Sequence, residues 1–162
     1  SEIVRLLLDT GAKVNVRDRN KQTPLMRIDD DASAELVEIL VRAGAKLNLS
    51  DNEGSTALIY ASANASTEVL AALINAGADV NIANKAGETP LMKAAEKGDI
   101  ESVRLLLISG ANVNARDKEG DNAWDYADED EIEQLLVSFG VEVPPDELPA
   151  VRIENPDLNI RR

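Results

Sequence analysis

The chain has 162 residues and is strongly acidic, with 30 Asp and Glu against 17 Lys and Arg and a net charge of −13. Because nucleic-acid phosphates are bound by basic surfaces, this balance disfavours a nucleic-acid partner. The chain has no Cys and no His. This excludes disulfides and cysteine metal sites, and no recognisable catalytic arrangement or cofactor site remains. Only 2% of the residues are aromatic, so the core must consist of Leu, Ile, Val and Ala.

Glycine followed by alanine recurs at a constant spacing of 33 residues, at Gly11, Gly44, Gly77 and Gly110. Threonine keeps the same spacing at Thr23, Thr56 and Thr89. A fixed period of this length indicates a solenoid, in which one supersecondary unit is repeated and each copy buries its apolar face against its neighbours. We therefore expect one solenoid domain over residues 1–140.

Residues 1–17 match only the second half of a repeat, with the apolar residues Ile3, Val4, Leu6 and Leu7 before Gly11. We expect a helix here. Since the chain starts inside a repeat and without Met, we also expect it to be a fragment whose true N-terminus is missing.

Residues 18–50, 51–83 and 84–116 are three full repeats. In the third, Thr89 precedes Pro90, which predicts a helix start: the hydroxyl caps free amides and Pro fits the first helical position. Thr23 and Pro24 predict the same start in the first full repeat. There, however, a bulky Ile28 and an Asp follow where the third repeat has two small Ala residues, so we expect a less regular helix.

The second half of each full repeat carries a helical stripe of apolar residues, and a Gly ends the predicted helix where a left-handed residue is needed. The stripes consist of Leu36, Val37, Ile39 and Leu40; Val69, Leu70, Leu73 and Ile74; and Val103, Leu105, Leu106 and Leu107.

Residues 117–140 form a last repeat that is three residues shorter than the others. Asn122 stands in the Thr column and Trp124 in a core Leu position, so we expect a degraded first helix and a buried Trp. A polar, irregular last repeat is typical of solenoid caps. The tail, residues 141–162, contains four Pro residues, and we expect Ala150–Ile160 to lie extended on the last repeats or on another copy.

The third repeat resembles the ankyrin repeat in its T-P-L start and its G-A-x-V-N end. The matching residues are Gly87, Thr89, Pro90, Leu91, Ala94, Ala95, Leu105, Leu106, Gly110, Ala111, Val113 and Asn114. The resemblance implies an all-α ankyrin-repeat solenoid of stacked helix-turn-helix units with projecting β-hairpin-like loops. Met26, Ile59, Met92 and Asp125 fill the family's His place, so the family's Thr–His hydrogen bond must be absent.

The same resemblance implies a protein-binding surface in the concave groove. The residues after the His place face that groove and vary with the partner; here they are Arg27, Tyr60, Lys93 and Tyr126. Further candidates lie on the loops at Gln22, Ser55, Glu88 and Asp121. Tyr and Arg are enriched at interface hot spots. The competing interpretation is that both tyrosines only pack between repeats.

Charge is uneven along the chain. Residues 1–27 hold six basic and three acidic residues, a net of +3, whereas residues 117–147 hold twelve acidic residues and one Lys, a net of −11. An acidic end favours a basic protein partner. The competing interpretation, which we prefer, is that these acids simply keep the last repeat soluble. The run Asp29–Asp31 lacks the spaced ligands and turn Gly of a cation site, so no metal is expected.

These observations predict a monomeric, non-catalytic module that binds another protein. Two alternatives stay open: a targeting or regulatory arm of a larger multidomain protein or effector, and an acidic inhibitor or immunity-type protein for a basic enzyme. No apolar run approaches membrane-spanning length. We therefore expect no membrane partner, and a cytoplasmic location.

Overall fold

The computed structural model describes residues 2–28, 33–64 and 66–143. Within these ranges the chain forms seven α-helices and one 3-10 turn, with no strand. The elements are α1 (Glu2–Asp9), η1 (Pro24–Arg27), α2 (Ala34–Arg42), α3 (Ala57–Asn64), α4 (Thr67–Asn75), α5 (Pro90–Lys97), α6 (Ile100–Ile108) and α7 (Asp130–Ser138). The expectations for Asp29–Asp31 and Ala150–Ile160 lie outside the described residues.

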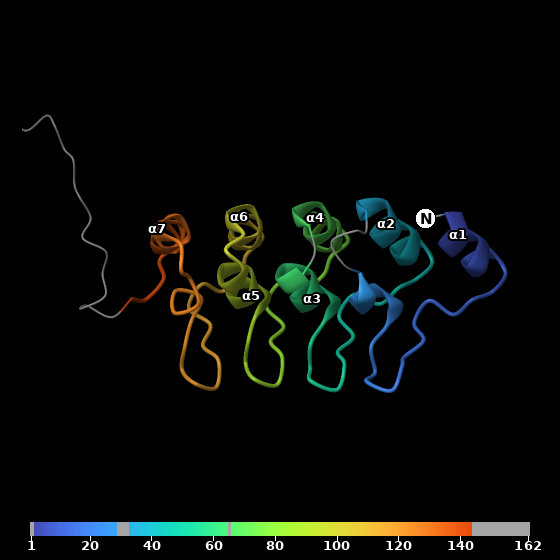
Figure 1. Ribbon diagram of the computed structural model, residues 1–162, viewed down its shortest axis with the longest axis horizontal. Coiled ribbons are helices and arrows are strands. Elements are labelled where there is room, and N and C mark those ends of the chain that lie inside the picture. The colour runs from blue at the N-terminus through green and yellow to red at the C-terminus, as the bar shows by residue number, and fades with distance from the viewer. Residues whose placement is uncertain (1, 29–32, 65, 144–162) are drawn as a thin grey trace, which may run out of the picture.

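The repeats stack side by side in one row (Figure 1). The outer helices α1, α2, α4, α6 and α7 form one layer, and η1, α3 and α5 form the inner layer beside them. Loops project from the inner layer on one side of the stack. We call these loops fingers; the first to fourth fingers contain residues 18–22, 51–55, 84–88 and 117–121. The predicted all-α solenoid is therefore confirmed.

Each finger is closed like a hairpin and tied to the next one. The Asp51 N–H donates to the carbonyl of Ser55 at 3.0 Å within the second finger. Between fingers, Lys85 N–H donates to the Glu53 carbonyl at 2.8 Å, and Lys118 N–H donates to the Ala86 carbonyl at 2.9 Å. The fingers therefore form one connected row. Their paired segments are too short to be strands.

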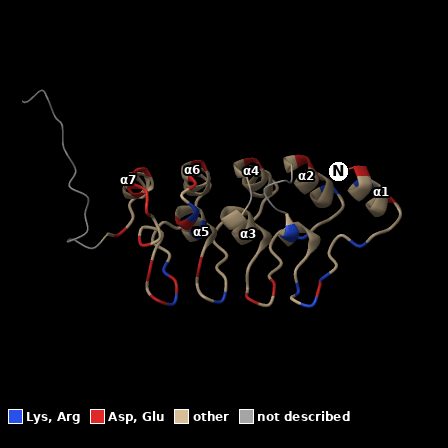
Figure 2. Ribbon diagram, viewed as in Figure 1, with Lys and Arg blue, Asp and Glu red and all other residues tan. Residues whose placement is uncertain are grey.

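Charged residues gather on the fingers and on the outer helices, whereas α3 carries none (Figure 2). The other inner elements do carry charge: η1 contains Arg27, and α5 contains Lys93, Glu96 and Lys97.

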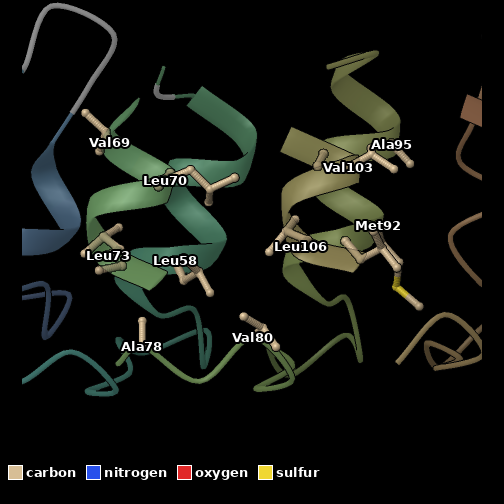
Figure 3. Packing of buried hydrophobic residues seen from close by; sticks show 14 of the residues in the cluster. Leu58, Val69, Leu70, Leu73, Ala78, Val80, Met92, Ala95, Val103 and Leu106 are labelled. Atoms are coloured by element: carbon tan, nitrogen blue, oxygen red, sulfur yellow. The ribbon is translucent and has the colours of Figure 1, made fainter. Parts of the chain in front are cut away.

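The core consists of the predicted apolar stripes of the outer helices, packed against the inner helices (Figure 3). Leu73 and Leu106 occupy equivalent positions in α4 and α6 and are fully buried. Gly77 ends α4 at φ 96°, and the next residue, Ala78, donates its N–H to the Leu73 carbonyl at 3.0 Å. The prediction of a left-handed glycine after each outer helix is confirmed.

The structure confirms the predicted starts of the inner elements only in part. The Thr89 hydroxyl accepts the N–H of Met92 at 3.3 Å, and the Met92 sulfur accepts the Thr89 N–H at 3.3 Å. Methionine thus supplies a return contact in the position of the family's His. In the first full repeat the Met26 sulfur accepts the Thr23 N–H at 3.4 Å, but the buried Thr23 hydroxyl has no partner among the described residues. The predicted hydroxyl cap is wrong there.

The two irregular repeats deviate as their sequences predict. The inner element of the first full repeat, η1, is a single 3-10 turn of four residues, where α3 and α5 have eight. In the last repeat, residues 123–126 form a turn instead of a helix. Asn122 holds this turn: its side-chain oxygen accepts the Trp124 N–H at 2.8 Å. Trp124 is 6% exposed, which confirms that it is buried.

A column of Asn residues, each four residues after the Gly that ends an outer helix, ties each repeat to the next. The Asn81 side chain donates to the Gly110 carbonyl at 3.1 Å and accepts the Asn112 N–H at 2.7 Å. Asn114 repeats this pattern one step later, with the carbonyl of Gly140 and the N–H of Glu142. The brace therefore extends past the last repeat and fixes residues 141–143 against it.

Candidate protein-binding groove

The predicted groove residues lie where the inner elements meet the fingers. Arg27 ends η1, Tyr60 and Lys93 each stand fourth in α3 and α5, and Tyr126 ends the turn of the last repeat. Together with the finger residues they form two hydrogen-bonded clusters, which we call cluster one and cluster two.

Cluster one joins the first full repeat to the second. Arg27 donates to Oε1 of Gln22 at 2.9 Å, and Gln22 donates through Nε2 to the Tyr60 hydroxyl at 2.7 Å. Tyr60 donates in turn to Oδ2 of Asp51 at 2.7 Å. Burial and the hydrogen bond to Asp51 raise the pKa of Tyr60 above its ordinary value. Burial also opposes ionisation of Asp51, but hydrogen bonds from Tyr60 and from finger N–H groups outweigh it and lower the pKa of that carboxyl.

Cluster two joins the third full repeat to the last. The Lys93 ammonium donates to Oε1 of Glu88 and to Oε2 of Glu96, each at 2.8 Å. It also lies 5.9 Å from the centre of the Tyr126 ring, within the range of a cation–π contact. The Tyr126 hydroxyl donates to Oδ2 of Asp117 at 2.6 Å. The hydrogen bond from Lys93 lowers the pKa of Glu88.

The two clusters are equivalent positions of the repeat. Gln22 and Glu88, Arg27 and Lys93, and Tyr60 and Tyr126 are each 66 residues apart, which is two steps of 33. The side-chain pattern of the groove therefore has a period of two repeats, whereas the backbone has a period of one repeat. The chemical difference is that a neutral Gln in cluster one is replaced by a carboxylate in cluster two.

Both tyrosines serve the scaffold. Tyr60 and Tyr126 are half-buried, and each hydroxyl is bound to the Asp that starts its finger. The ring thus braces a finger against the inner element of the same repeat. This contact supports the packing interpretation of the tyrosines, while a role in binding stays a prediction.

The remaining finger candidates differ in access. Gln22 and Glu88 are half-buried members of the clusters. Asp121 is half-buried and donates its N–H to Oδ1 of Asp117 at 2.9 Å. Ser55 is only 7% exposed, so it offers a partner almost no surface.

The residues that hold the fingers were not among those predicted from the sequence. Each finger starts with Asp or Asn, and its side-chain oxygen accepts N–H groups from two and four residues further on. These residues are Asp18, Asp51, Asn84 and Asp117. Their spacing of 33 was a readable signal, and short side chains that bind their own backbone are typical of turns.

Two hollows accompany the clusters. The first, of ≈ 330 Å³, is lined by Gln22, Met26, Arg27, Ile28, Tyr60 and Asn64. The second, of ≈ 540 Å³, is lined by Glu53, Lys85, Ala86, Glu88, Asp117, Lys118, Glu119 and Tyr126. The groove thus offers a partner recesses at two places along the stack, each with a tyrosine ring in its wall.

A family model described as ankyrin repeats (3 copies) matches the chain over two overlapping ranges, residues 28–117 and 64–143. The chain belongs to the ankyrin repeat family. No curated protein matches the chain. Ankyrin repeats generally mediate protein–protein interaction and are typically non-catalytic. Over the described part of the chain, this ankyrin stack contains no helix with the length and apolar character needed to cross a membrane.

Proposed function

We propose that this ankyrin stack is a non-catalytic module that binds a partner protein in the groove between its fingers and inner elements. The observation that carries the proposal is the fixed state of the groove side chains. Tyr60, Lys93 and Tyr126 are each held by hydrogen bonds of 2.6–2.8 Å in the free chain. Side chains ordered in advance lose little entropy on binding, which favours affinity.

The proposal covers both an independent protein and the targeting or regulatory arm of a larger one, since the same groove would serve either. The partner is identified by capture from the source cell on the immobilised chain. Ala86→Trp provides the test, because Ala86 is exposed on the third finger and lines the second hollow. We expect the captured partner to be lost.

Ala76→Trp is the matched control, because Ala76 is equally an exposed Ala but lies after the outer helix α4. It should capture the partner as the unchanged chain does. If both variants capture equally, or if both fail while folded, the groove is not the binding surface.

A second candidate, an acidic inhibitor of a basic enzyme, draws on α7. Its first turn contains Asp130, Glu131 and Glu133, and burial together with the Asp130 charge raises the pKa of Glu133. Such crowding of like charge is relieved by a basic partner. This candidate predicts that salt and Glu131→Lys each abolish binding, whereas Ala86→Trp leaves binding intact. That result would favour the inhibitor over the groove.

A further inference from the structure

The two hollows of the groove share two equivalent positions, Gln22 with Glu88 and Tyr60 with Tyr126, but they differ in charge. In the first, Arg27 is the one charged lining residue among those that the structure describes. In the second, four carboxylates and two Lys residues line the wall, a net of −2. Counted over the described lining residues, the groove therefore carries positive charge at the first hollow and negative charge at the second.

Most hydrogen-bond donors of the Arg27 guanidinium are not used by the described residues. It is exposed, its one hydrogen bond goes to the neutral amide of Gln22, and it forms no salt bridge among the described residues. The equivalent Lys93, in contrast, is paired with two carboxylates. A guanidinium has five donors in a fork that matches a carboxylate. An acidic side chain in the first hollow would meet this fork beside Tyr60.

The second hollow suits a basic side chain. The Tyr126 ring in its wall already attracts one cation, because the Lys93 ammonium lies 5.9 Å from the ring centre. Lys93 is itself neutralised by Glu88 and Glu96. Glu53 and Glu119 line the same hollow and form no salt bridge within the described ranges. A basic side chain entering here would meet carboxylates and an aromatic face together.

The spacing of the hollows limits the length of the ligand. The hollows are two repeats apart, and packed helices lie about 8–10 Å apart, which places the hollows about 16–20 Å from one another. An extended chain advances roughly 3.3–3.6 Å per residue, so the span takes about five or six residues.

We propose that the groove binds an extended segment of the partner that places an acidic side chain on Arg27 and a basic side chain, five or six residues away, in the second hollow. This inference rests on the proposed function and adds the chemistry and spacing of the ligand.

The probe is a displayed library of random twelve-residue peptides, selected on the chain, on Arg27→Glu and on Arg104→Glu. Arg104 is the matched control because it is an exposed Arg on the outer helix α6. The unchanged chain and Arg104→Glu should enrich peptides with an acid and a base five or six residues apart. Arg27→Glu should lose the acid and prefer a base in its place.

Synthetic peptides from the selection then test each contact by fluorescence anisotropy. Arg27→Glu should weaken a selected peptide at least tenfold, and a peptide whose acid is changed to Lys should recover the loss. Glu119→Lys should lower affinity for the basic residue, whereas Glu101→Lys on α6 should not. Urea unfolding midpoints near that of the unchanged chain exclude misfolding as the cause.

The outcomes separate the two proposals. Peptides that compete with the captured partner but bind Arg27→Glu unchanged would overturn the inference and leave the groove function intact. A selection that yields no such spaced pair overturns it as well. The Ala86→Trp capture experiment judges the groove function independently of either result.

Discussion

The Tyr126 hydroxyl donates a 2.6 Å hydrogen bond to Oδ2 of Asp117, nine residues before it. Oδ1 of the same carboxylate accepts the N–H groups of Glu119, Gly120 and Asp121. One carboxylate therefore fixes both the finger and the tyrosine. Tyr60 and Asp51 repeat the arrangement in the second repeat.

Removing the Tyr126 hydroxyl should loosen the finger. The aromatic ring stays in place, so the change creates no cavity. We expect Tyr126→Phe to lower the free energy of unfolding by about 0.5–1 kcal/mol, which is below the usual range for a bond to a charged group because water reaches the site. Urea unfolding measures the change. Tyr60→Phe should behave alike, and no loss in either variant would contradict the bracing role.

Acid should weaken the stack through the same carboxylates. The hydrogen bond from Tyr126 lowers the pKa of Asp117 in the folded chain, while an unfolded Asp titrates at about 3.9. The folded chain thus holds this charge more readily than the unfolded chain. The resulting stability is fully present above about pH 4 and is lost as the pH falls through the lower folded value.

Tyr126→Phe should remove part of this pH dependence, because it removes the largest cause of the shift. We expect urea midpoints of the variant and the unchanged chain to differ more at pH 7 than at pH 2.5. An equal difference at both values would show that the Asp117 charge does not contribute. NMR titration of Asp117 in the folded chain gives its pKa directly.

Lys21 occupies a glycine position of the fingers. Its φ is 62°, and the equivalent residues Gly54, Gly87 and Gly120 all have positive φ. A residue with a Cβ is strained in this conformation, whereas Gly is not. We expect Lys21→Gly to raise the free energy of unfolding by up to about 1 kcal/mol, after allowing for the greater freedom of Gly in the unfolded chain. Lys21→Ala, which keeps the Cβ, is the control and should give no such gain.

The reverse change should be costly at Gly87. A Cβ built there would lie 2.7 Å from the Cα of Asp117 in the next finger. Since the Asp117 Cα belongs to the backbone of the next finger, it cannot move aside without separating the two fingers. Gly87→Ala should therefore destabilise more than Gly120→Ala, whose Cβ would meet nothing within 4 Å. Equal losses would mean that strain in φ alone decides the cost.

The outer stripe should dominate stability. Leu106 is fully buried between repeats, and its removal to Ala should cost on the order of 2–5 kcal/mol. Ile108, two residues later on the same helix, is 68% exposed, and its change to Ala should cost far less. Comparable losses measured by chemical denaturation would place the helix in a different register.

The backbone was predictable because its causes are local and periodic. The chain needs a left-handed residue at Gly77 to end the helix, however the repeats pack. The apolar stripe that contains Leu106 must likewise face the core, whichever repeats lie beside it. The groove was less predictable, because the Tyr60 and Tyr126 hydroxyls donate hydrogen bonds to finger carboxylates. The positions of these carboxylates depend on the folded loop. The Thr23 hydroxyl was assigned a capping role from its type, but in the 3-10 turn η1 the Met26 N–H donates to the Thr23 carbonyl at 3.0 Å instead.

The last repeat should depend on the segment that follows it. The side chains of Asn114 and Asn122 both bind the backbone of Glu142, at 2.7 and 2.9 Å, and Val141 and Val143 pack partly against the core. Deleting residues 141–162 should therefore lower the melting temperature and speed amide exchange in residues 117–140. Asn114→Ala should reproduce part of the effect, because it removes one of the two anchors.

Asn48→Ala is the control for that experiment. Asn48 is the equivalent Asn two repeats earlier, where its side chain accepts the Asp79 N–H at 3.0 Å. Its removal should speed exchange near residue 79 and leave residues 117–140 as they were. If exchange in 117–140 stays unchanged after the deletion, the Asn braces at this end do not stabilise the stack. The proposed docking of Ala150–Ile160 would then lose its support, since a tail that covers the last repeat must protect it.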